Sequence, residues 1–336
     1  MLQADQISKF FENTAAVRSV TLEVRPGEVI GLVGESGSGK STFLNLLAGL
    51  ADADEGTVRF NGERIKGPSE QLVAGHPLIK LVHQEYQLMP NVSIRENIAY
   101  ALRYYERTFQ DYRVAELLKT CRLEHVADRI PKHVSGGEKQ RTAIARALAE
   151  KPADGLPMIL LLDEPFSHLD LPNRILVRDL LLDVVRHERM GCLFVTHDAS
   201  DALSISDRLG ILQNGRLIQL APPARVYRYP YNSYAARMTG PANIVRAKQL
   251  PALGVQHIFH PNAAVCIRPE QLRLNDRGAF GGIVQRVLFK GLFSEVDIEV
   301  NRQTTLTALA TYPTELSVGQ VVGLDLLGGV HWLKDL

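Results

Sequence analysis

A glycine-rich segment near the start of the chain has the residue types and spacing that bind phosphate. Residues 34–41 read Gly-Glu-Ser-Gly-Ser-Gly-Lys-Ser and fit the pattern G-x-x-x-x-G-K-[ST]. They follow the apolar stretch 28–33, which is typical of a strand buried on both faces, and they precede a helical pattern over 40–50. Glycines let the backbone curl so that successive N–H groups face one anion, and the helix dipole adds partial positive charge. The segment therefore predicts a site for nucleotide phosphates.

This phosphate loop predicts a role for its polar side chains. Lys40 is expected to reach the β and γ phosphates of ATP, and Ser41 is expected to offer its hydroxyl to Mg²⁺. A chance match to the pattern is expected in about 1% of chains of this length, and the position between a strand and a helix lowers that figure. The residues expected to contact the nucleotide here are Gly34, Glu35, Ser36, Gly37, Ser38, Gly39, Lys40, Ser41 and Thr42.

Two acidic residues end a second apolar stretch, 159–164, which reads Ile-Leu-Leu-Leu-Asp-Glu. In open α/β sheets ligands bind beyond the carboxyl ends of the strands, so both acidic side chains are expected beside the phosphates. Asp163 is expected to orient Mg²⁺ through water, and Glu164 to polarise the water that attacks the γ-phosphorus. By itself an Asp-Glu pair at a strand end is equally compatible with an ordinary surface. In combination with the phosphate loop it favours ATP hydrolysis.

Predicted strands and helices alternate over the first 240 residues, and two short strands are expected to open the chain. The strands are expected at 19–24, 28–33, 57–60, 78–82, 158–163, 192–196, 207–213 and 216–220, and the helices at 40–50, 94–126, 136–150 and 173–188. Apolar strands that alternate with helices indicate an α/β fold with a parallel sheet covered on both faces. Asn214-Gly215, between the last two strands, predicts a type I′ hairpin.

The pattern changes near residue 240, where helical periodicity ends. Short alternating segments follow at 264–267, 282–288, 294–300, 305–310 and 321–327. Strands spaced roughly ten residues apart suggest a small β-barrel or sandwich. We therefore predict two domains, an α/β domain over 1–239 with a helical subdomain at about 90–150, and a small all-β domain over 240–336.

Composition excludes several classes of protein. The chain has 336 residues, 45% of them hydrophobic and 22% charged, which is the composition of a globular protein. A net charge of +1 gives no general reason to expect nucleic acid or an anionic membrane as a ligand. Three scattered cysteines predict reduced thiols without a metal cluster. The N-terminus has no signal-peptide pattern, and the longest apolar run is too short for a membrane helix. A soluble chain is therefore expected, and any role at a membrane requires a partner.

A further motif carries a family resemblance. Residues 134–141, Val-Ser-Gly-Gly-Glu-Lys-Gln-Arg, resemble the signature motif of ATP-binding-cassette (ABC) ATPases. The motif has the chemistry of a second phosphate-binding helix N-terminus, although an ordinary N-capped helix is the alternative. The resemblance implies that it binds the ATP of another subunit, so that two sites are completed in a head-to-tail dimer. The implied contact residues are Ser135, Gly136, Gly137 and Glu138.

Four other positions match the family in order, and the resemblance covers residues 5 to about 235. It implies that Phe11 stacks on adenine, although a core position and the adjacent Phe10 are alternatives. Gln84 resembles the glutamine that joins the Mg²⁺ and water region to a transmembrane partner. Asp170, in the segment Ser-His-Leu-Asp, resembles the D-loop at the dimer interface, and His197 resembles the switch histidine on the γ-phosphate. The implied catalytic set is Glu164, His197, Lys40 and Gln84, and the implied metal set is Ser41, Gln84 and Asp163.

The sequence departs from the family pattern in three places. Val134 stands where leucine is usual, and Glu138 stands where glutamine is usual, which adds negative charge near the partner's nucleotide. The loop 152–157 is longer than usual, and a tolerated surface insertion is the expected explanation.

The C-terminal segment resembles the transport-associated (TOBE) domain of bacterial importer ATPases. The similar segments are 240–243, 267–270, 282–284 and 289–291. The resemblance implies a domain that stabilises the dimer and in some members binds regulatory ligands, and no nucleic-acid partner is expected.

These observations predict the ATPase subunit of a bacterial importer, with ATP and Mg²⁺ as its ligands. The implied partners are a second copy of the chain and two permease subunits that meet Gln84 and the segment 94–126, with an extracytoplasmic substrate-binding protein as an indirect partner. The implied location is peripheral, on the cytoplasmic face of the inner membrane. The substrate expectation is ferric iron or a polyamine, and otherwise sulfate, molybdate or a sugar.

Two other functions are compatible with parts of the sequence. A soluble ABC ATPase of translation or DNA repair usually has two cassettes or a long coiled-coil insertion, and neither is seen in this sequence. A regulatory module with a dead ATPase is disfavoured by the intact residues Lys40, Asp163, Glu164 and His197.

Overall fold

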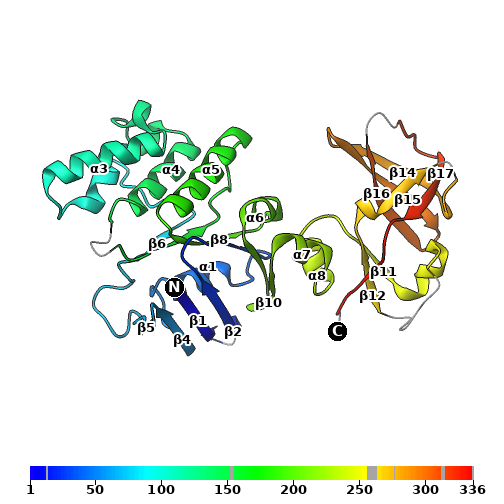
Figure 1. Cartoon of the computed structure of the whole chain (residues 1–336), viewed down its shortest axis with the longest axis horizontal. Helices are drawn as coiled ribbons and strands as arrows, with labels where there is room; N and C mark the ends of the chain where they lie inside the picture. Colours follow the sequence, from blue (N-terminus) through cyan, green and yellow to red (C-terminus); the bar gives the residue numbers. More distant parts are fainter. Residues whose placement is uncertain (13, 152–154, 256–262, 276, 312–314, 335–336) are drawn as a thin grey trace. The chain divides into compact units, whose positions relative to one another are not determined.

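The structure is a computed structural model that describes residues 1–336 except 13, 152–154, 256–262, 276, 312–314 and 335–336. The chain forms two compact units, Met1–Pro223 and Ala224–Leu336 (Figure 1). The domain boundary predicted after residue 239 lies within the second unit and stays a prediction. Half of the unusual loop predicted at 152–157 lies outside the described residues. None of the described helices is long and apolar enough to cross a bilayer.

A six-stranded sheet forms the centre of the first unit. Its strands lie in the order β10-β9-β3-β8-β7-β6, all parallel except β10, which pairs antiparallel with β9. The bounds are β3 (Val29–Val33), β6 (Ile79–Val82), β7 (Ile159–Asp163), β8 (Gly191–Thr196), β9 (Arg208–Gln213) and β10 (Arg216–Ala221). Every residue of β3 and β8 is buried. The predicted α/β fold is therefore confirmed, and positive φ angles at Asn214 (50°) and Gly215 (78°) match the predicted hairpin turn.

A second, antiparallel sheet begins the chain and has the order β2-β1-β4-β5. Its strands are β1 (Leu2–Phe11), β2 (Thr14–Val24), β4 (Glu55–Phe60) and β5 (Glu63–Arg64). The prediction that the chain opens with strands at 19–24 and 28–33 is wrong, because β1 precedes both. The pairing of β1 with β2 shifts register between Ala4 and Phe10, so the period-2 alternation that marks a strand is interrupted.

Helix α1 (Lys40–Leu47) connects the phosphate loop to both sheets. It contacts β1 and β2 of the antiparallel sheet and β7 of the central sheet. Phe43, Leu44 and Leu47 are fully buried in the core that these elements share. Because the start of α1 is anchored by this core, the loop before it has a fixed position at the sheet edge.

The helical segment of the first unit packs on the side of the central sheet away from α1 (Figure 1). Its helices are α2 (Ile94–Ala99), α3 (Arg107–Thr120), α4 (Gly136–Ala147) and α5 (Leu171–His187), and α4 contacts α2, α5 and β6. The prediction of continuous helix over 94–126 is wrong in detail: a 3-10 turn at Tyr100–Leu102 ends α2, and exposed residues precede α3. The chain turns back there, so that Val114, Leu117 and Leu118 of α3 are buried. Helix α6 (Ala199–Ile205) packs on β3.

The second unit is rich in antiparallel strands. After α7 (Pro223–Arg228) and α8 (Ser233–Met238), two sheets have the orders β11-β12-β18 and β13-β17-β14-β15-β16. The strands are β11 (Asn243–Arg246), β12 (Ala264–Ile267), β13 (Leu272–Asn275), β14 (Phe280–Phe289), β15 (Phe293–Asn301), β16 (Thr304–Thr311), β17 (Val321–Leu326) and β18 (His331–Trp332). Because the edge strands β13 and β16 also contact each other, the larger sheet curls into a nearly closed barrel. The predicted small β-barrel is confirmed.

One arginine joins the two C-terminal segments that carry the family resemblance. Arg268 is 3% exposed, and its guanidinium donates to the carbonyl oxygens of Gly240 (3.3 Å), Pro241 (3.0 Å) and Tyr227 (2.7 Å). It also stacks on the ring of Tyr227 at 4.0 Å. Backbone oxygens thus satisfy the buried cation and fix the segment 240–243 to the segment 267–270.

Candidate nucleotide site

A cavity of about 360 Å³ lies at the carboxyl ends of β3, β7 and β8. Most of the predicted site residues meet there. The lining residues are Ala16, Ser36, Gly37, Gly39, Lys40, Ser41, Thr42, Gln84, Asp163, Glu164 and His197. Ala16 was missed by the sequence-based prediction, because alanine in a strand has no chemical signature. Gly34, Glu35 and Ser38 are not lining residues, although all three belong to the loop.

The backbone of the phosphate loop requires glycine at position 39. Gly39 has φ of 99°, and a Cβ atom on it would lie 2.0 Å from the carbonyl oxygen of Ala16. No other residue fits this position without moving the strand that carries Ala16. The close approach therefore fixes the loop against β2.

Lys40 is held inside the loop. Its side chain is 7% exposed, and Nζ donates to the carbonyl oxygens of Gly34 (2.7 Å) and Glu35 (2.8 Å). Burial lowers the pKa of Lys40, while the nearby carboxylates of Glu164 and Asp163 oppose that shift. A desolvated ammonium attracts a phosphate more strongly than one in bulk water.

Asp163, Ser41 and Gln84 bring oxygen ligands to the lining of the cavity. Burial raises the pKa of Asp163, and a hydrogen bond from Ser41 acts in the opposite direction. In the described part of the chain, no cluster of three or more His, Cys, Asp or Glu residues forms a complete metal site. The donor set fits Mg²⁺, which prefers oxygen ligands and is usually held by one or two carboxylates together with substrate phosphates.

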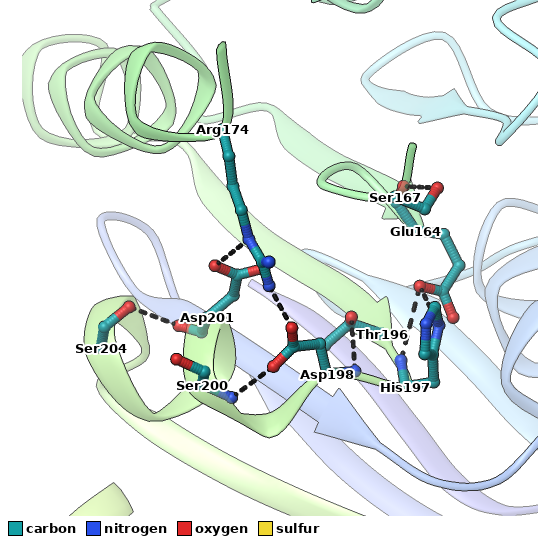
Figure 2. A network of polar contacts seen from close by, with 9 residues as sticks. All are labelled: Glu164, Ser167, Arg174, Thr196, His197, Asp198, Ser200, Asp201 and Ser204. Atoms are coloured by element: carbon teal, nitrogen blue, oxygen red, sulfur yellow. Dashed lines mark hydrogen bonds and ion pairs between the residues drawn. The ribbon is translucent and has the colours of Figure 1, made fainter. Parts of the chain in front are cut away.

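Glu164 and His197 form a pair across the ends of two neighbouring strands (Figure 2). Nδ1 of His197 lies 2.9 Å from Oε2 of Glu164, and the backbone N–H of His197 donates to the same oxygen at 3.4 Å. Glu164 has φ of 50°, in the left-handed region, and its carbonyl oxygen accepts from Oγ of Ser167 at 2.8 Å. Non-glycine residues in this region are rare and cluster at functional sites.

The signature segment lies at the start of α4 and contributes no lining residue to this cavity. Ser135 and Glu138 form a capping box: Oε2 of Glu138 accepts from the backbone N–H of Ser135 (2.7 Å) and from its hydroxyl (2.8 Å). Oε1 of Glu138 lies 2.9 Å from Nε2 of His125. A Cβ on Gly137 would lie 2.5 Å from Asn173, whereas a Cβ on Gly136 would make only ordinary van der Waals contacts, the nearest at 3.8 Å. The carboxylate at position 138 therefore caps the helix.

Phe11 and Asp170 also lie outside the cavity lining. Phe11 is 54% exposed at the end of β1, and Phe10 is exposed beside it, so neither ring occupies a core position. Asp170 caps α5, since its Oδ1 accepts from the backbone N–H of Asn173 at 3.1 Å and from its side-chain amide at 2.7 Å.

A larger groove of about 540 Å³ adjoins the strand that leads to Gln84. It is lined from β6, from the turn after α2 and from α4, and it includes Ala101, Arg146 and Ala147. Arg146 donates to the carbonyl oxygens of Tyr86 (3.0 Å) and Gln87 (2.7 Å), both of which have positive φ. Sequence reasoning missed Arg146 because its acceptors are backbone atoms about 60 residues away along the chain.

The fold and the cavity define a nucleotide-binding ATPase with a phosphate loop, and comparison with known proteins gives its family. A family model described as "ABC transporter" matches residues 17–167, and a "TOBE domain" model matches residues 265–329. The spermidine/putrescine import ATP-binding protein PotA of Thermotoga maritima is 32% identical over 316 residues (85% of this chain, 83% of that protein). The sulfate/thiosulfate import ATP-binding protein CysA of Nitrosomonas europaea is 34% identical over 333 residues (97% and 86%).

Solved structures agree with this assignment. The ATP-binding cassette MJ0796, solved as a dimer in a post-hydrolysis state with ADP and phosphate, is 29% identical. It superposes with a TM-score of 0.58 over 66% of this chain and 99% of that chain. The chain therefore belongs to the family of ABC-transporter ATP-binding subunits with a C-terminal TOBE domain, and it is an ABC-transporter ATPase.

Proposed function

We propose that this chain powers a bacterial importer by hydrolysing ATP in a dimer that is bound to permease subunits. The observation that carries the proposal is the convergence of Lys40, Asp163, Glu164 and His197 on one cavity. These four side chains supply a cation for phosphate, a metal-binding carboxylate, a base and a γ-phosphate contact. The family match supports the same chemistry.

The proposed division of labour follows from the geometry. Lys40 exchanges its two carbonyl acceptors for the β and γ phosphates, and Ser36 to Thr42 surround them with backbone N–H groups. Glu164 accepts a proton from the attacking water, while His197 holds the Glu164 carboxylate and contacts the γ-phosphate. Asp163, Ser41 and Gln84 would hold Mg²⁺, which when bound neutralises charge on the phosphates. The exposed ring of Phe11, whose centroid lies 5.7 Å from Nζ of Lys9, would stack on adenine.

A second copy of the chain completes the site in this proposal. The signature residues Ser135, Gly136 and Gly137 are exposed or lie at a helix N-terminus outside their own subunit's cavity. They are suited to the γ-phosphate bound by a partner, and Asp170 would lie at that interface. The dimeric state of the cassette MJ0796 supports this arrangement. ATP would close the dimer, and hydrolysis followed by release would reopen it.

The permease is proposed to dock in the groove beside Gln84. The groove is concave and largely apolar, and it joins the predicted helical subdomain to the strand that ends at the nucleotide cavity. A permease helix bound in this groove would be displaced when Gln84 moves, or when the backbone at Tyr86 and Gln87, to which Arg146 donates, moves. The chain would then work on the cytoplasmic face of the inner membrane, with a substrate-binding protein on the other side.

For the substrate we propose a polyamine, with ferric iron and sulfate as the next classes to test. The relatives described above are a polyamine and a sulfate import protein, with similar identity to this chain. The cassette itself has no contact with the cargo in this proposal, so the permease and the binding protein select it.

The direct test is purification of the tagged chain from detergent-solubilised membranes, followed by mass spectrometry. Stoichiometric recovery of a polytopic permease is expected, and that permease would narrow the substrate. Recovery without a membrane partner, or with ribosomes or DNA, would contradict the importer and favour an ABC ATPase of translation or DNA repair.

A further inference from the structure

Arg174 on α5 binds two carboxylates that follow the switch histidine. Its Nε lies 2.8 Å from both carboxylate oxygens of Asp201, and its Nη2 contacts Asp201 and also Asp198 (Figure 2). The hydrogen bond to Asp201 is the largest cause of a raised pKa of Arg174. The Asp201 side chain is 8% exposed, whereas those of Arg174 and Asp198 are 28% and 39% exposed. The pair with Asp201 is therefore better shielded from solvent than the pair with Asp198.

Asp198 is held on three sides, and this fixes the residue before it. One carboxylate oxygen accepts from the backbone N–H of Ser200 (2.8 Å) at the start of α6, and the other accepts from Arg174. The backbone N–H of Asp198 donates to Oγ1 of Thr196 at 3.0 Å. His197 lies between these two anchored residues, so its backbone direction follows from theirs. That direction aims the imidazole at Glu164.

Helix α5, which carries Arg174, is also connected to Glu164 through the segment that precedes it. Arg174 lies one turn into α5, and Asp170 caps that helix at the end of the segment 167–170. Ser167, at the start of the same segment, donates to the carbonyl oxygen of Glu164. Glu164 is therefore linked to Arg174 by two routes. One runs from the Ser167 hydrogen bond along the chain through Asp170 into α5. The other runs from the His197 contact along the chain to Asp198 and its ion pair with Arg174, and the contacts of both routes at Glu164 and Arg174 are drawn in Figure 2.

We propose that Arg174 is a positioning residue of the ATPase site, which keeps the loop of His197 aligned with Glu164 and couples that loop to segment 167–170. The inference rests on the proposed function, because it assumes that His197 and Glu164 act in hydrolysis. In the dimer proposed above, segment 167–170 would face the partner subunit, so engagement of the partner would be transmitted through Arg174 to the catalytic pair. The alternative is that Arg174 only stabilises the packing of α5 against α6, mainly through its ion pair with Asp201.

The test measures steady-state ATP hydrolysis, affinity for a fluorescent ATP analogue and the unfolding midpoint of the full-length chain. Arg174→Met is expected to lower kcat on the order of 10- to 100-fold with KM and analogue affinity nearly unchanged, because a small displacement of a catalytic group has effects of this size. Arg174→Lys is expected to restore part of kcat. Arg178→Met is the matched control: it lies one turn further along α5, and its ion-pair partner is its neighbour Asp179. It should behave as wild type.

Two comparisons distinguish a role of Arg174 in positioning the His197 loop from a role only in stabilising the packing of α5 against α6. Asp198→Asn should lower kcat more than Asp201→Asn if Arg174 acts through the His197 loop, and the reverse order would overturn the inference. These variants keep Arg174, so the comparison holds even if Arg174→Met does not fold.

In the His197→Ala background, Arg174→Met should add no further loss of kcat, and an additive loss would contradict the inference. Wild-type kcat in folded Arg174→Met would overturn this inference alone, whereas a wild-type chain without turnover would overturn the proposed function and this inference together.

Discussion

The carboxylate of Glu164 and the imidazole of His197 meet 2.9 Å apart at the ends of the adjacent strands β7 and β8. The two residues are 33 positions apart in the sequence. They meet because the parallel strands β7 and β8, which precede them, end at the same edge of the sheet. Glu164 adopts a left-handed backbone conformation there, which turns its side chain toward the cavity that contains Lys40.

Replacement of Glu164 by glutamine tests its role as the base. The amide cannot accept the proton of the attacking water, so phosphate release is expected to fall by about 10²- to 10⁴-fold. ATP binding should persist, because the phosphate loop is unchanged. Phosphate release and binding of radiolabelled ATP measure the two effects. The exposed Glu188, which pairs with Lys151 at the end of α5, gives the control Glu188→Gln. Normal turnover in Glu164→Gln would remove Glu164 as the base.

Two glycine variants separate backbone strain from steric conflict in the phosphate loop. Gly39 and Gly62 both have positive φ (99° and 89°), so alanine at either position costs about 1–2 kcal/mol of stability. A Cβ at Gly62 has open space, whereas one at Gly39 would meet Ala16 at 2.0 Å. Gly39→Ala should therefore lose nucleotide binding in equilibrium titrations, and Gly62→Ala should retain it. Equal affinities in the two variants would contradict the described loop.

The Mg²⁺ requirement should depend on pH through Asp163. Burial raises the pKa of this carboxyl, and a proton on it competes with a metal ion. The Mg²⁺ concentration that gives half-maximal hydrolysis should therefore rise as the pH falls. Because the pKa of Asp163 is raised, this rise should begin at a higher pH than it would for an aspartate with an ordinary pKa. Chelation with EDTA should stop turnover, and Asp163→Asn should need more Mg²⁺ and lose most of this pH dependence. A pH profile of Mg²⁺ dependence that is unchanged in Asp163→Asn would assign the metal to other groups.

A substitution in the groove should uncouple hydrolysis from transport. Ala101 lines the groove beside the strand that leads to Gln84, so Ala101→Arg would fill the proposed permease site with a charged side chain. ATP hydrolysis by the isolated chain should be preserved, while uptake in cells should fall at least about tenfold, as loss of a central contact produces. Ala115→Arg, on an exposed position of α3, is the control. Equal uptake by both variants would place the permease elsewhere.

The parts of the site that sequence could predict are those with a local pattern. The phosphate loop, Asp163 with Glu164, and the signature segment that begins a helix at Ser135 each lie within one short segment, and the structure places each at the expected end of a strand or helix. The roles of these residues remain predictions that the experiments above address.

The parts that sequence missed depend on distant neighbours. The ion-pair partners of Arg174 lie 24 and 27 residues away, and no repeat or motif marks such a contact. Strand β1 was missed because its register shifts break the alternating pattern, and the break between α2 and α3 depends on which apolar residues find a core. In each case the outcome depends on tertiary packing, which the local sequence pattern does not determine.

Disulfide cross-linking tests the central claim, that one subunit's phosphate loop is completed by the signature segment of another. The native cysteines, Cys121, Cys192 and Cys266, are buried and give little background. Chains carrying Ser36→Cys are mixed with chains carrying Ser135→Cys, both in the Glu164→Gln background, and are oxidised with and without ATP. Ser36 and Ser135 are exposed, and cysteine is close to serine in size. A cross-linked dimer that requires both variants and ATP is the predicted result. No ATP-dependent cross-link, in chains that still bind ATP, would contradict the composite site.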